Sequence, residues 1–461
     1  MLIQKFGGTS VEDAKAIRNI AEIVRKELAR HPVVVLSACA GVTNQLLQTA
    51  SFASQGKKDD ALQTVAAIEG RHKKIIKDLF EPETSKFLMK HISAFAEELA
   101  ALVDGVSILG ELTPRSLDMF ASYGERMSSF IVHHYFETVK IRSFLVDARS
   151  FMITDDQYTK AVPILDAVER KLREIVQPKV ENKYVVVTQG FIGATQAGIT
   201  TTVGRGGSDY SAALIGALLD VEDIQIWTDV DGILTADPSV VKDAKKIRVM
   251  SFNEAAELAY FGARVLHPET ILPAVKKNIP VHVLNSRRPS STGTLIVAKP
   301  KIDRQCIVKS IAYKEGITVI SIVSTRMFLA HGFLENVFDV FHKYETVVHT
   351  VATSEVSTSV TVDNVKNLGH ILRELKTFAT VSVSDKKAIV CVVGEHLKNS
   401  PGIAARVLNT ITDINVNMIS QGASEINISF VIDEDHVDDV VRRLHKEFFS
   451  DVRHLTEIFE E

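Results

Sequence analysis

The sequence predicts an α/β protein in which a mainly parallel sheet, sandwiched by helices, is followed by two smaller α+β units. Strand, polar turn and helix follow one another from Met1 to Leu28 and again from Pro32 onward. Such alternation is typical of parallel sheets, because crossover connections place helices on the sheet faces. The second observation is an internal repeat. Shifting the C-terminal third by 70 positions brings Gly332 onto Gly402 and Ser354-Glu355 onto Ser424-Glu425, which indicates duplicated α+β units.

Length and composition favour several globular domains. The chain has 461 residues, of which 46% are hydrophobic. A chain of this length is too long to fold around a single hydrophobic core. The composition turns to Ser, Arg, Pro, Thr and Gly over residues 286–293, which marks a boundary. We therefore expect a catalytic domain at 1–298, a first regulatory unit at 299–384 and a second at 385–461, to which a strand at about 305–313 could be added.

Charge and cysteine content exclude several classes of partner. The net charge of −4 gives no reason to expect nucleic acid or an anionic membrane. No apolar run approaches the roughly 20 residues that span a bilayer, and there is no cleavage-like leader. The three cysteines form no CxxC pair, which favours a reducing compartment and a cytoplasmic protein.

The end of the first strand predicts an anion site. Lys5-Phe6-Gly7-Gly8-Thr9-Ser10 places a cation and exposed backbone amides where a strand ends and a helix begins. The helix N-terminus adds partial positive charge, which favours phosphate. Ser10 followed by Asp13 predicts a capping box. Alone, such a short glycine motif is more typical of an ordinary turn with a surface lysine.

A long helix from Pro114 carries a candidate binding acid. Residues 59–104 are helical in pattern and show no chemistry, whereas Glu125 lies beside Gly124 within the next helix. Glycine weakens a helix interior, so we expect close access by another group there. The alternative for Glu125 is a solvated helix acid paired with a neighbour.

A second glycine cluster lies at Gly204-Arg205-Gly206-Gly207-Ser208-Asp209. Arg205 offers a planar fork for a carboxylate or phosphate, and Ser208 is a candidate N-cap of the following helix. The cluster lacks the Lys-Ser/Thr of a Walker loop and the dinucleotide spacing. It therefore indicates a second phosphate cradle that faces the first. The Asp-rich segments after Trp227 are more typical of turns than of metal sites. We expect His267 to be a structural residue rather than a metal ligand.

The motifs described above, taken in their order along the chain, closely resemble those of the aspartate kinase family. Two further stretches share this resemblance: Trp227-Thr228-Asp229 and the stretch from Phe261 to Pro268. Tandem ACT domains complete the resemblance, which covers essentially the whole chain. It implies an amino-acid-kinase fold that phosphorylates the L-aspartate side chain with ATP, giving 4-phospho-L-aspartate for lysine, threonine and methionine biosynthesis. Because the chain stops after the second ACT unit, we expect the monofunctional, lysine-sensitive type.

The resemblance also implies roles for individual residues. Glu125 would meet the α-ammonium of aspartate and Arg205 its α-carboxylate. Mg²⁺ would be bound mainly through the ATP phosphates, with no metal site in the protein itself. The implied catalytic residues are Lys5 and Asp209; the implied substrate-binding residues are Thr43, Glu125, Arg205, Gly206, Gly207 and Ser208; the implied nucleotide-binding residues are Lys5, Phe6, Gly7, Gly8, Thr228, Asp229, Leu234, Arg264 and Val265.

The first ACT unit resembles a lysine-binding unit, with departures. His349 stands where an aspartate would meet the effector's ammonium, and Val347 replaces a serine. In the nucleotide pocket, Leu234 and Ser239 replace a tyrosine and an arginine, and Arg264 replaces a lysine. Lysine is favoured as the inhibitor. The alternatives are threonine, lysine and threonine in combination, or no inhibition. The implied effector residues are Met327, Gly332, Phe333, Leu334, Val348, His349, Ser354 and Glu355.

Two other kinds of protein remain as alternatives. One is another kinase of the fold, acting on glutamate or uridylate; Glu125 with Arg205 favours an amino-acid substrate, and the ACT pair argues against uridylate. The other is a non-catalytic amino-acid sensor, which the presence of Lys5 and Asp209 disfavours. Pairing of ACT units across subunits predicts a homodimer as the smallest assembly, with a tetramer as the alternative.

Overall fold

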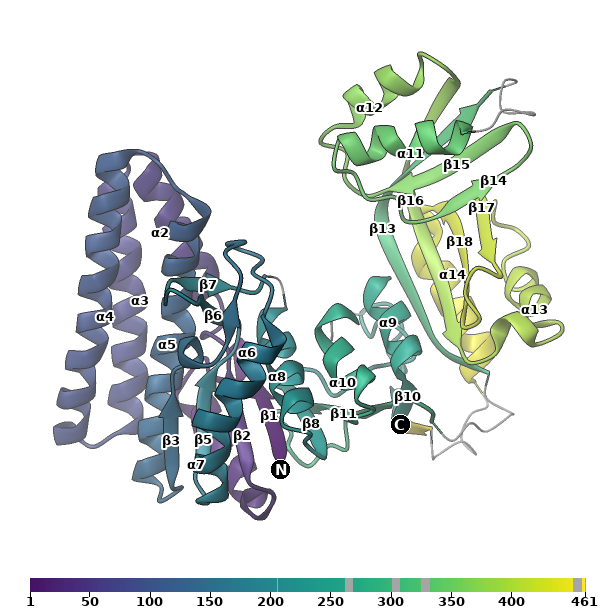
Figure 1. Cartoon of the computed structure of the whole chain (residues 1–461). Coiled ribbons are helices and arrows are strands. Elements are labelled where there is room, and N and C mark those ends of the chain that lie inside the picture. The colour runs from purple at the N-terminus through teal and green to yellow at the C-terminus, as the bar shows by residue number, and fades with distance from the viewer. Residues whose placement is uncertain (205, 262–267, 301–306, 325–331, 451–457, 461) are drawn as a thin grey trace. The chain divides into compact units, whose positions relative to one another are not determined.

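The structure is a computed structural model that describes residues 1–204, 206–261, 268–300, 307–324, 332–450 and 458–460 (Figure 1). The chain divides into two compact units. The first comprises Met1–Ile233, Arg248–Phe252 and Val265–Pro300. The second comprises Leu234–Ile247, Asn253–Arg264 and Lys301–Glu461.

A mainly parallel sheet forms the centre of the first unit, as the sequence predicts. Its order is β10-β12-β11-β8-β1-β2-β5-β3, and all neighbours are parallel except β11 and β12. Parallel strands buried on both faces are rich in Val and Ile, and β2 reads Pro-Val-Val-Val-Leu. The strands are β1 (Leu2–Phe6), β2 (Pro32–Leu36), β3 (Ser143–Val146), β5 (Val185–Gln189), β8 (Asp223–Thr228), β10 (Val249–Ser251), β11 (Val281–Asn285) and β12 (Thr294–Val297).

Helices pack against both faces of this sheet. Phe6 belongs to a core with α1 and α5. The preceding side chain on the strand, Lys5, points to the opposite face, toward α8. A small sheet of β4 (Ile153–Thr154), β6 (Ile192–Thr195) and β7 (Thr200–Thr202) adjoins α5. The helices are α1 (Ala14–Lys26), α2 (Val42–Ser54), α5 (Pro114–Thr138), α6 (Leu165–Lys171), α7 (Gln177–Glu181), α8 (Gly207–Leu218) and α10 (Leu272–Lys276).

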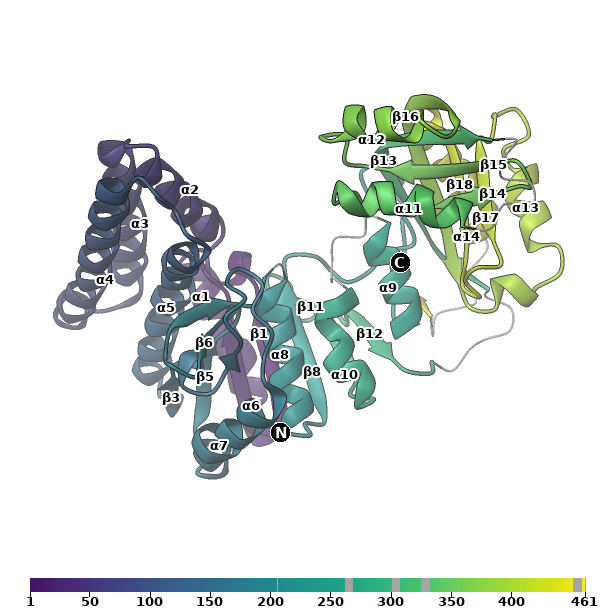
Figure 2. The same cartoon turned by 45° about the horizontal axis from the view of Figure 1, so that its top comes forward.

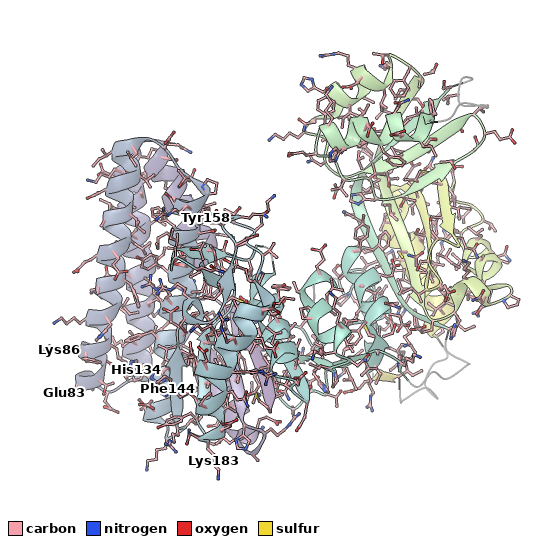
Figure 3. The ribbon with its side chains drawn as sticks, in the orientation of Figure 1. Glu83, Lys86, His134, Phe144, Tyr158 and Lys183 are labelled. Carbon is pink, nitrogen blue, oxygen red and sulfur yellow. The ribbon has the colours of Figure 1, made fainter. Side chains whose placement is uncertain are left out.

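The predicted helical segment after residue 58 is a long hairpin. Helices α3 (Lys58–Leu79) and α4 (Pro82–Leu109) run side by side in both views (Figures 1 and 2). Glu83 and Lys86 lie on the exposed side of α4 (Figure 3). Within the described residues, none of the helices combines the length and the apolar character needed to cross a membrane.

The first helix is capped differently from the sequence prediction. Residues Gly8–Ser10 form a 3-10 turn, and α1 begins only at Ala14. The side chain of Asp13 caps it by accepting a hydrogen bond from the Ala16 amide at 2.8 Å. The Ser10 hydroxyl instead donates to Ser286 Oγ at 2.7 Å. The capping-box prediction at Ser10 was wrong because a tertiary partner holds that hydroxyl.

The second unit contains the two predicted α+β copies in one antiparallel sheet of order β14-β15-β13-β16-β18-β17. Gly332 and Gly402 occupy equivalent N-caps of α11 and α13, each at φ 80°. The first copy comprises β13 (Val308–Val323), α11 (Phe333–Lys343), β14 (Val351–Thr353), β15 (Ser357–Val362) and α12 (Leu368–Leu375). The second comprises β16 (Thr380–Gly394), α13 (Ile403–Asn409), β17 (Met418–Gln421), β18 (Asn427–Asp433) and α14 (Val437–Phe449).

Three shorter elements complete this unit. Most of helix α9 (Phe252–Tyr260) belongs to it, together with the strand pair β9 (Lys246–Ile247) and β19 (Phe459–Glu460). A buried ion pair between Lys309 of β13 and Glu254 of α9 spans 2.9 Å. This pair joins α9 to the long strand of the first copy.

Close packing explains the helical glycine next to Glu125. A Cβ on Gly124 would lie 2.6 Å from the Cβ of Ala38, in the loop after β2. We expect Gly124→Ala to lower the free energy of unfolding by about 1–3 kcal/mol, because the added methyl group has no room. Thermal denaturation measures the change.

Gly105→Ala is the matched control. A Cβ at Gly105 on α4 would meet nothing within 4 Å, so alanine should be neutral or should stabilise the helix by about 0.5–1 kcal/mol. Equal melting temperatures for the two variants would contradict the packing argument.

Candidate active site

A cavity of about 680 Å³ lies in the first unit, where β1 and β2 end. Ligands of α/β proteins bind at this carboxyl edge. Helices α2 and α5 and the start of α8 supply further parts of the wall. The predicted site residues that line the cavity are Lys5, Gly8, Thr43, Glu125, Gly206, Gly207, Ser208 and Asp209.

Lys5 and Asp209 form an ion pair inside the cavity. The Lys5 Nζ lies 2.6 Å from Asp209 Oδ1, and Lys5 is only 8% exposed. Lys5 lies on β1 between β2 and β8, whereas Asp209 belongs to the first turn of α8. A buried ammonium needs such a partner to remain charged. The pair therefore holds a positive charge at the sheet edge in a fixed position.

The start of α8 presents backbone rather than a side-chain cap. Gly206, at φ 70°, is the N-cap, and no side chain of the described residues caps the helix. The predicted cap at Ser208 was wrong, because the left-handed glycine starts the helix two residues earlier. Ser208 lines the cavity instead, at a helix N-terminus that favours anions.

Glu125 is buried at the cavity wall, with 3% of its surface exposed. Burial raises its pKa to about 8, against the opposing effects of a backbone hydrogen bond from Ala38 and the charge of Lys5. Its Oε2 has no hydrogen-bond partner among the described residues. An unsatisfied buried carboxylate oxygen beside a cavity is an acceptor for a ligand donor, and a cationic donor suits it best.

Asp118 is a cavity residue that the sequence reading missed. Its carboxylate accepts hydrogen bonds from the amide and hydroxyl of Thr202, at 3.0 and 2.6 Å, and from the Thr159 amide at 2.9 Å. Burial raises its pKa, whereas these hydrogen bonds oppose the rise. Asp118 precedes Glu125 by seven residues, which places both on one face of α5. That spacing is the signal that could have revealed it.

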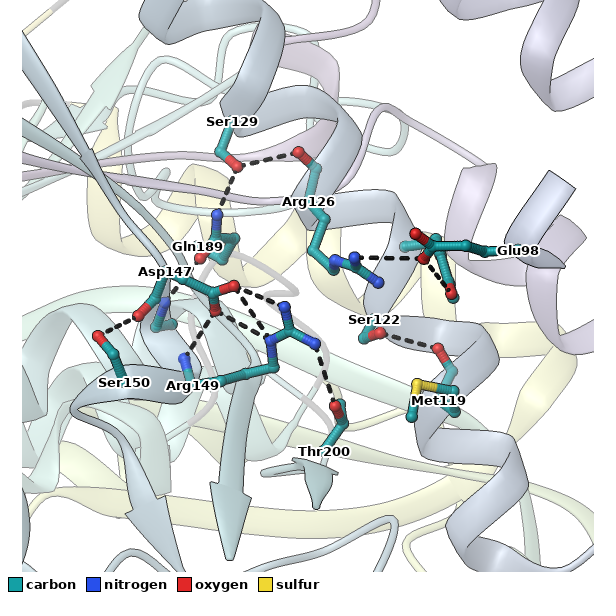
Figure 4. A network of polar contacts seen from close by, with 12 residues as sticks. Glu98, Met119, Ser122, Arg126, Ser129, Asp147, Arg149, Ser150, Gln189 and Thr200 are labelled. Carbon is teal, nitrogen blue, oxygen red and sulfur yellow. Dashed lines mark hydrogen bonds and ion pairs between the residues drawn. The ribbon is translucent and has the colours of Figure 1, made fainter. Parts of the chain in front are cut away.

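A polar network fixes the strand that leads into the second glycine cluster (Figure 4). Arg149 binds both carboxylate oxygens of Asp147, at 3.0 and 2.6 Å, and donates to Thr200 Oγ1 of β7 at 3.4 Å. Gln189 donates to Ser129 Oγ of α5 and accepts from the Ala148 amide, each at 2.7 Å. These bonds tie α5, β5 and β7 together beside the cavity.

Other predicted nucleotide residues lie away from the cavity wall or already have partners. Phe6 is fully buried and stacks on Trp227 at 6.1 Å, so its side chain belongs to the core. The Gly7 amide donates to the Trp227 carbonyl at 3.0 Å. Thr228 ends β8 and Asp229 follows it, with the two side chains 3.2 Å apart.

Some predicted residues cannot be placed in this cavity. Leu234 belongs to the second unit, where its carbonyl accepts a hydrogen bond from the Ser310 hydroxyl at 2.8 Å. Arg205, Arg264, Val265, His267 and Met327 lie outside the described residues.

The predicted effector residues lie around α11 and β14. His349 is held from two sides: Nδ1 lies 2.6 Å from the Tyr260 hydroxyl, and Nε2 lies 3.0 Å from Asp363. Burial is the main cause that lowers its pKa, and nearby Lys314 adds to this effect. Phe333 and Val348 pack into the core of this copy. Gly332 is exposed at the α11 N-cap, Leu334 and Glu355 are exposed, and Ser354 Oγ contacts Ser357 Oγ at 2.7 Å.

The chain matches two family models. Residues 1–285 match the amino acid kinase family, and residues 390–448 match the ACT domain. Aspartokinase 1, chloroplastic, of Arabidopsis thaliana is 37% identical over 97% of this chain and 80% of its own length. Lysine-sensitive aspartokinase 3 of Escherichia coli is 34% identical over 98% of this chain and 99% of its own length.

A solved structure agrees with these matches. The crystal structure of E. coli aspartokinase III in complex with aspartate and ADP (R-state) superposes with a TM-score of 0.83 at 34% identity, covering 97% of this chain and 100% of that one. With similarity of this extent along nearly the whole chain, the protein belongs to the aspartokinase family.

Proposed function

We propose that this protein transfers the γ-phosphoryl group of ATP to the side-chain carboxylate of L-aspartate, forming 4-phospho-L-aspartate. The observation that carries the proposal is the buried Glu125 carboxylate, whose open oxygen shares one cavity with the Lys5–Asp209 pair. An amino-acid substrate offers an ammonium group to Glu125. Membership of the aspartokinase family supports aspartate as that amino acid.

The chemistry asks for positioning and charge neutralisation rather than for a general base. The aspartate side chain is already ionised at pH 7, so its oxygen attacks the γ-phosphorus directly while the bond to the bridging oxygen of ADP breaks. Lys5 neutralises charge on the transferred group, and Asp209 keeps Lys5 in place. The amides at the start of α8 add partial positive charge.

Substrate contacts follow the walls of the cavity. Glu125 takes the α-ammonium, and Thr43, Gly206, Gly207 and Ser208 line the space for the rest of aspartate. Arg205, within the same glycine cluster, supplies a fork for the α-carboxylate.

Magnesium is expected as a companion of ATP. We expect this ion to be carried mainly by the nucleotide phosphates. Asp209 is the carboxylate nearest to Lys5 that could also contact it. When bound, Mg²⁺ supplies neutralisation of phosphate charge.

Regulation resides in the second unit, with lysine as the effector and a homodimer as the smallest assembly. The name of the E. coli relative, lysine-sensitive aspartokinase, supports lysine. We place the protein in the cytoplasm, because Cys39 and Cys391 are buried free thiols, which suits a reducing compartment.

Trapping with hydroxylamine tests the reaction. Wild-type protein with ATP, Mg²⁺ and aspartate should yield aspartyl hydroxamate, whereas glutamate should yield far less product. Lys5→Ala should lower kcat by about 10³-fold or more with a smaller change in KM, because the charge acts mainly in the transition state.

Lys15→Ala, which changes an exposed lysine on α1, is the matched control and should retain wild-type kcat. Absence of hydroxamate with the wild type would overturn the proposed reaction, and an unchanged kcat in Lys5→Ala would remove Lys5 from it.

The raised pKa of Glu125 predicts pH-dependent aspartate binding. With a pKa of about 8, the free protein holds Glu125 mostly protonated at pH 7, whereas an ammonium ligand favours the carboxylate. Binding at pH 7 should therefore release close to one proton. The KM for aspartate should fall, by at most tenfold per pH unit, as the pH rises from 6 toward 8, and should then level off.

Calorimetric titration of aspartate in two buffers of different ionisation enthalpy measures the released proton. Glu125→Gln should bind aspartate more weakly and release no proton. Proton release that persists in this variant would assign the titration to another group.

Lysine inhibition tests the placement of the effector site. Lysine should inhibit the wild type, and His349→Asp should shift the inhibition curve to lower lysine concentrations, because a carboxylate beside Asp363 attracts the effector's ammonium. Threonine serves as the comparison ligand. An unshifted curve in His349→Asp would place the effector elsewhere.

A further inference from the structure

Arg71 connects the helical hairpin to the active-site cavity. It lies on α3, where the sequence shows no chemistry. Its Nη1 donates to the Ala40 carbonyl at 2.5 Å, and its Nη2 donates to the Glu12 carbonyl at 3.2 Å. Ala40 lies in the loop after β2, whereas Glu12 lies between the 3-10 turn after β1 and helix α1. One guanidinium therefore holds two loops that are separate in sequence.

These two loops form adjoining walls of the cavity and contact each other directly. The Ala40 amide donates to the Gly8 carbonyl at 3.0 Å, and Cys39 Sγ lies 3.0 Å from the Val11 carbonyl. A Cβ on Gly8 would lie only 2.9 Å from the Ala38 carbonyl oxygen. A small change in the spacing of the loops would therefore move Gly8 relative to Lys5, which lies three residues earlier on β1.

The helix that carries Arg71 is packed into the core. Its neighbours Ile68, Ile75 and Ile76 on α3 are buried in the core of the first unit. Glu12 is also held through its carboxylate, which lies 2.7 Å from Arg287 Nη2. A planar guanidinium donates in two fixed directions, whereas a lysine ammonium acts as a point charge on a flexible chain.

We propose that Arg71 is a positioning residue for phosphoryl transfer: through the Ala40 and Glu12 carbonyls it fixes the spacing of the two phosphate-facing loops. The inference rests on the proposed function for its kinetic consequence. This positioning role depends on the two fixed donor directions of the planar guanidinium and not only on its positive charge. Misplacement of reacting groups by about 1 Å can cost on the order of 10²-fold in rate.

The kinetic test compares Arg71→Ala and Arg71→Lys with wild type in the hydroxamate assay. Both variants should lower kcat by about 10- to 100-fold, with KM for ATP and aspartate within about threefold, because the substrate contacts themselves remain. Methylguanidinium ions should restore part of kcat in Arg71→Ala, where the space is open. They should not restore it in Arg71→Lys.

Arg18→Ala is the matched control. Arg18 on α1 also donates to a backbone carbonyl, that of Asp78 on α3, but Asp78, unlike Ala40, does not line the cavity. This variant should keep wild-type kcat. Wild-type kcat in Arg71→Lys would show that charge alone suffices and would overturn the inference, as would equal losses of kcat and melting temperature in Arg18→Ala and Arg71→Ala.

Hydrogen–deuterium exchange of the ligand-free protein provides a readout independent of catalysis. In Arg71→Ala, amides of residues 8–12 and 38–42 should exchange faster than in the wild type, whereas Arg18→Ala should leave both segments unchanged. Unchanged exchange in Arg71→Ala would overturn the inference. Failure of the wild type to form hydroxamate would instead overturn the proposed function, and the exchange result would still decide whether Arg71 holds the loops.

Discussion

The ion pair between Lys5 and Asp209 is the interaction on which the cavity depends. Lys5 extends from a central strand that is buried along its whole length, and its charge can be buried there only with a partner. Asp209 provides that partner from the first turn of α8. The pair therefore brings together two glycine segments that lie about two hundred residues apart in sequence, and it places a cation where the sheet ends.

Two buried acids on one face of α5 show how hydrogen bonding separates a structural role from a binding role. Burial raises the pKa of both Asp118 and Glu125. The Asp118 carboxylate accepts hydrogen bonds from Thr159 and Thr202 and so holds this part of the cavity wall together. Glu125 keeps an oxygen without a partner among the described residues. The difference lies in hydrogen bonding and not in charge, and only the structure could reveal it.

Periodicity and repetition in the sequence predicted the parallel sheet and the duplicated α+β units, because alternating elements and a 70-residue shift leave direct traces. Local capping was predicted less well. Ser10 and Ser208 have the right chemistry for caps, but a tertiary hydrogen bond and a left-handed glycine decided those helix starts. Arg71 was beyond prediction, since a side chain that binds backbone carbonyls leaves no partner to recognise in the sequence.

The two α+β copies are interleaved through β13. Residues 318–323 of this strand pair with β15 of the first copy on one side, whereas β16, which opens the second copy, pairs with β13 on the other side from residue 308 to residue 323. A chain shortened between the copies would leave the edge of β13 that faces β16 open over residues 308–323, and unpaired edges invite association with other chains. Once the strands had interleaved, evolution could therefore not delete either copy without exposing a strand edge of the other.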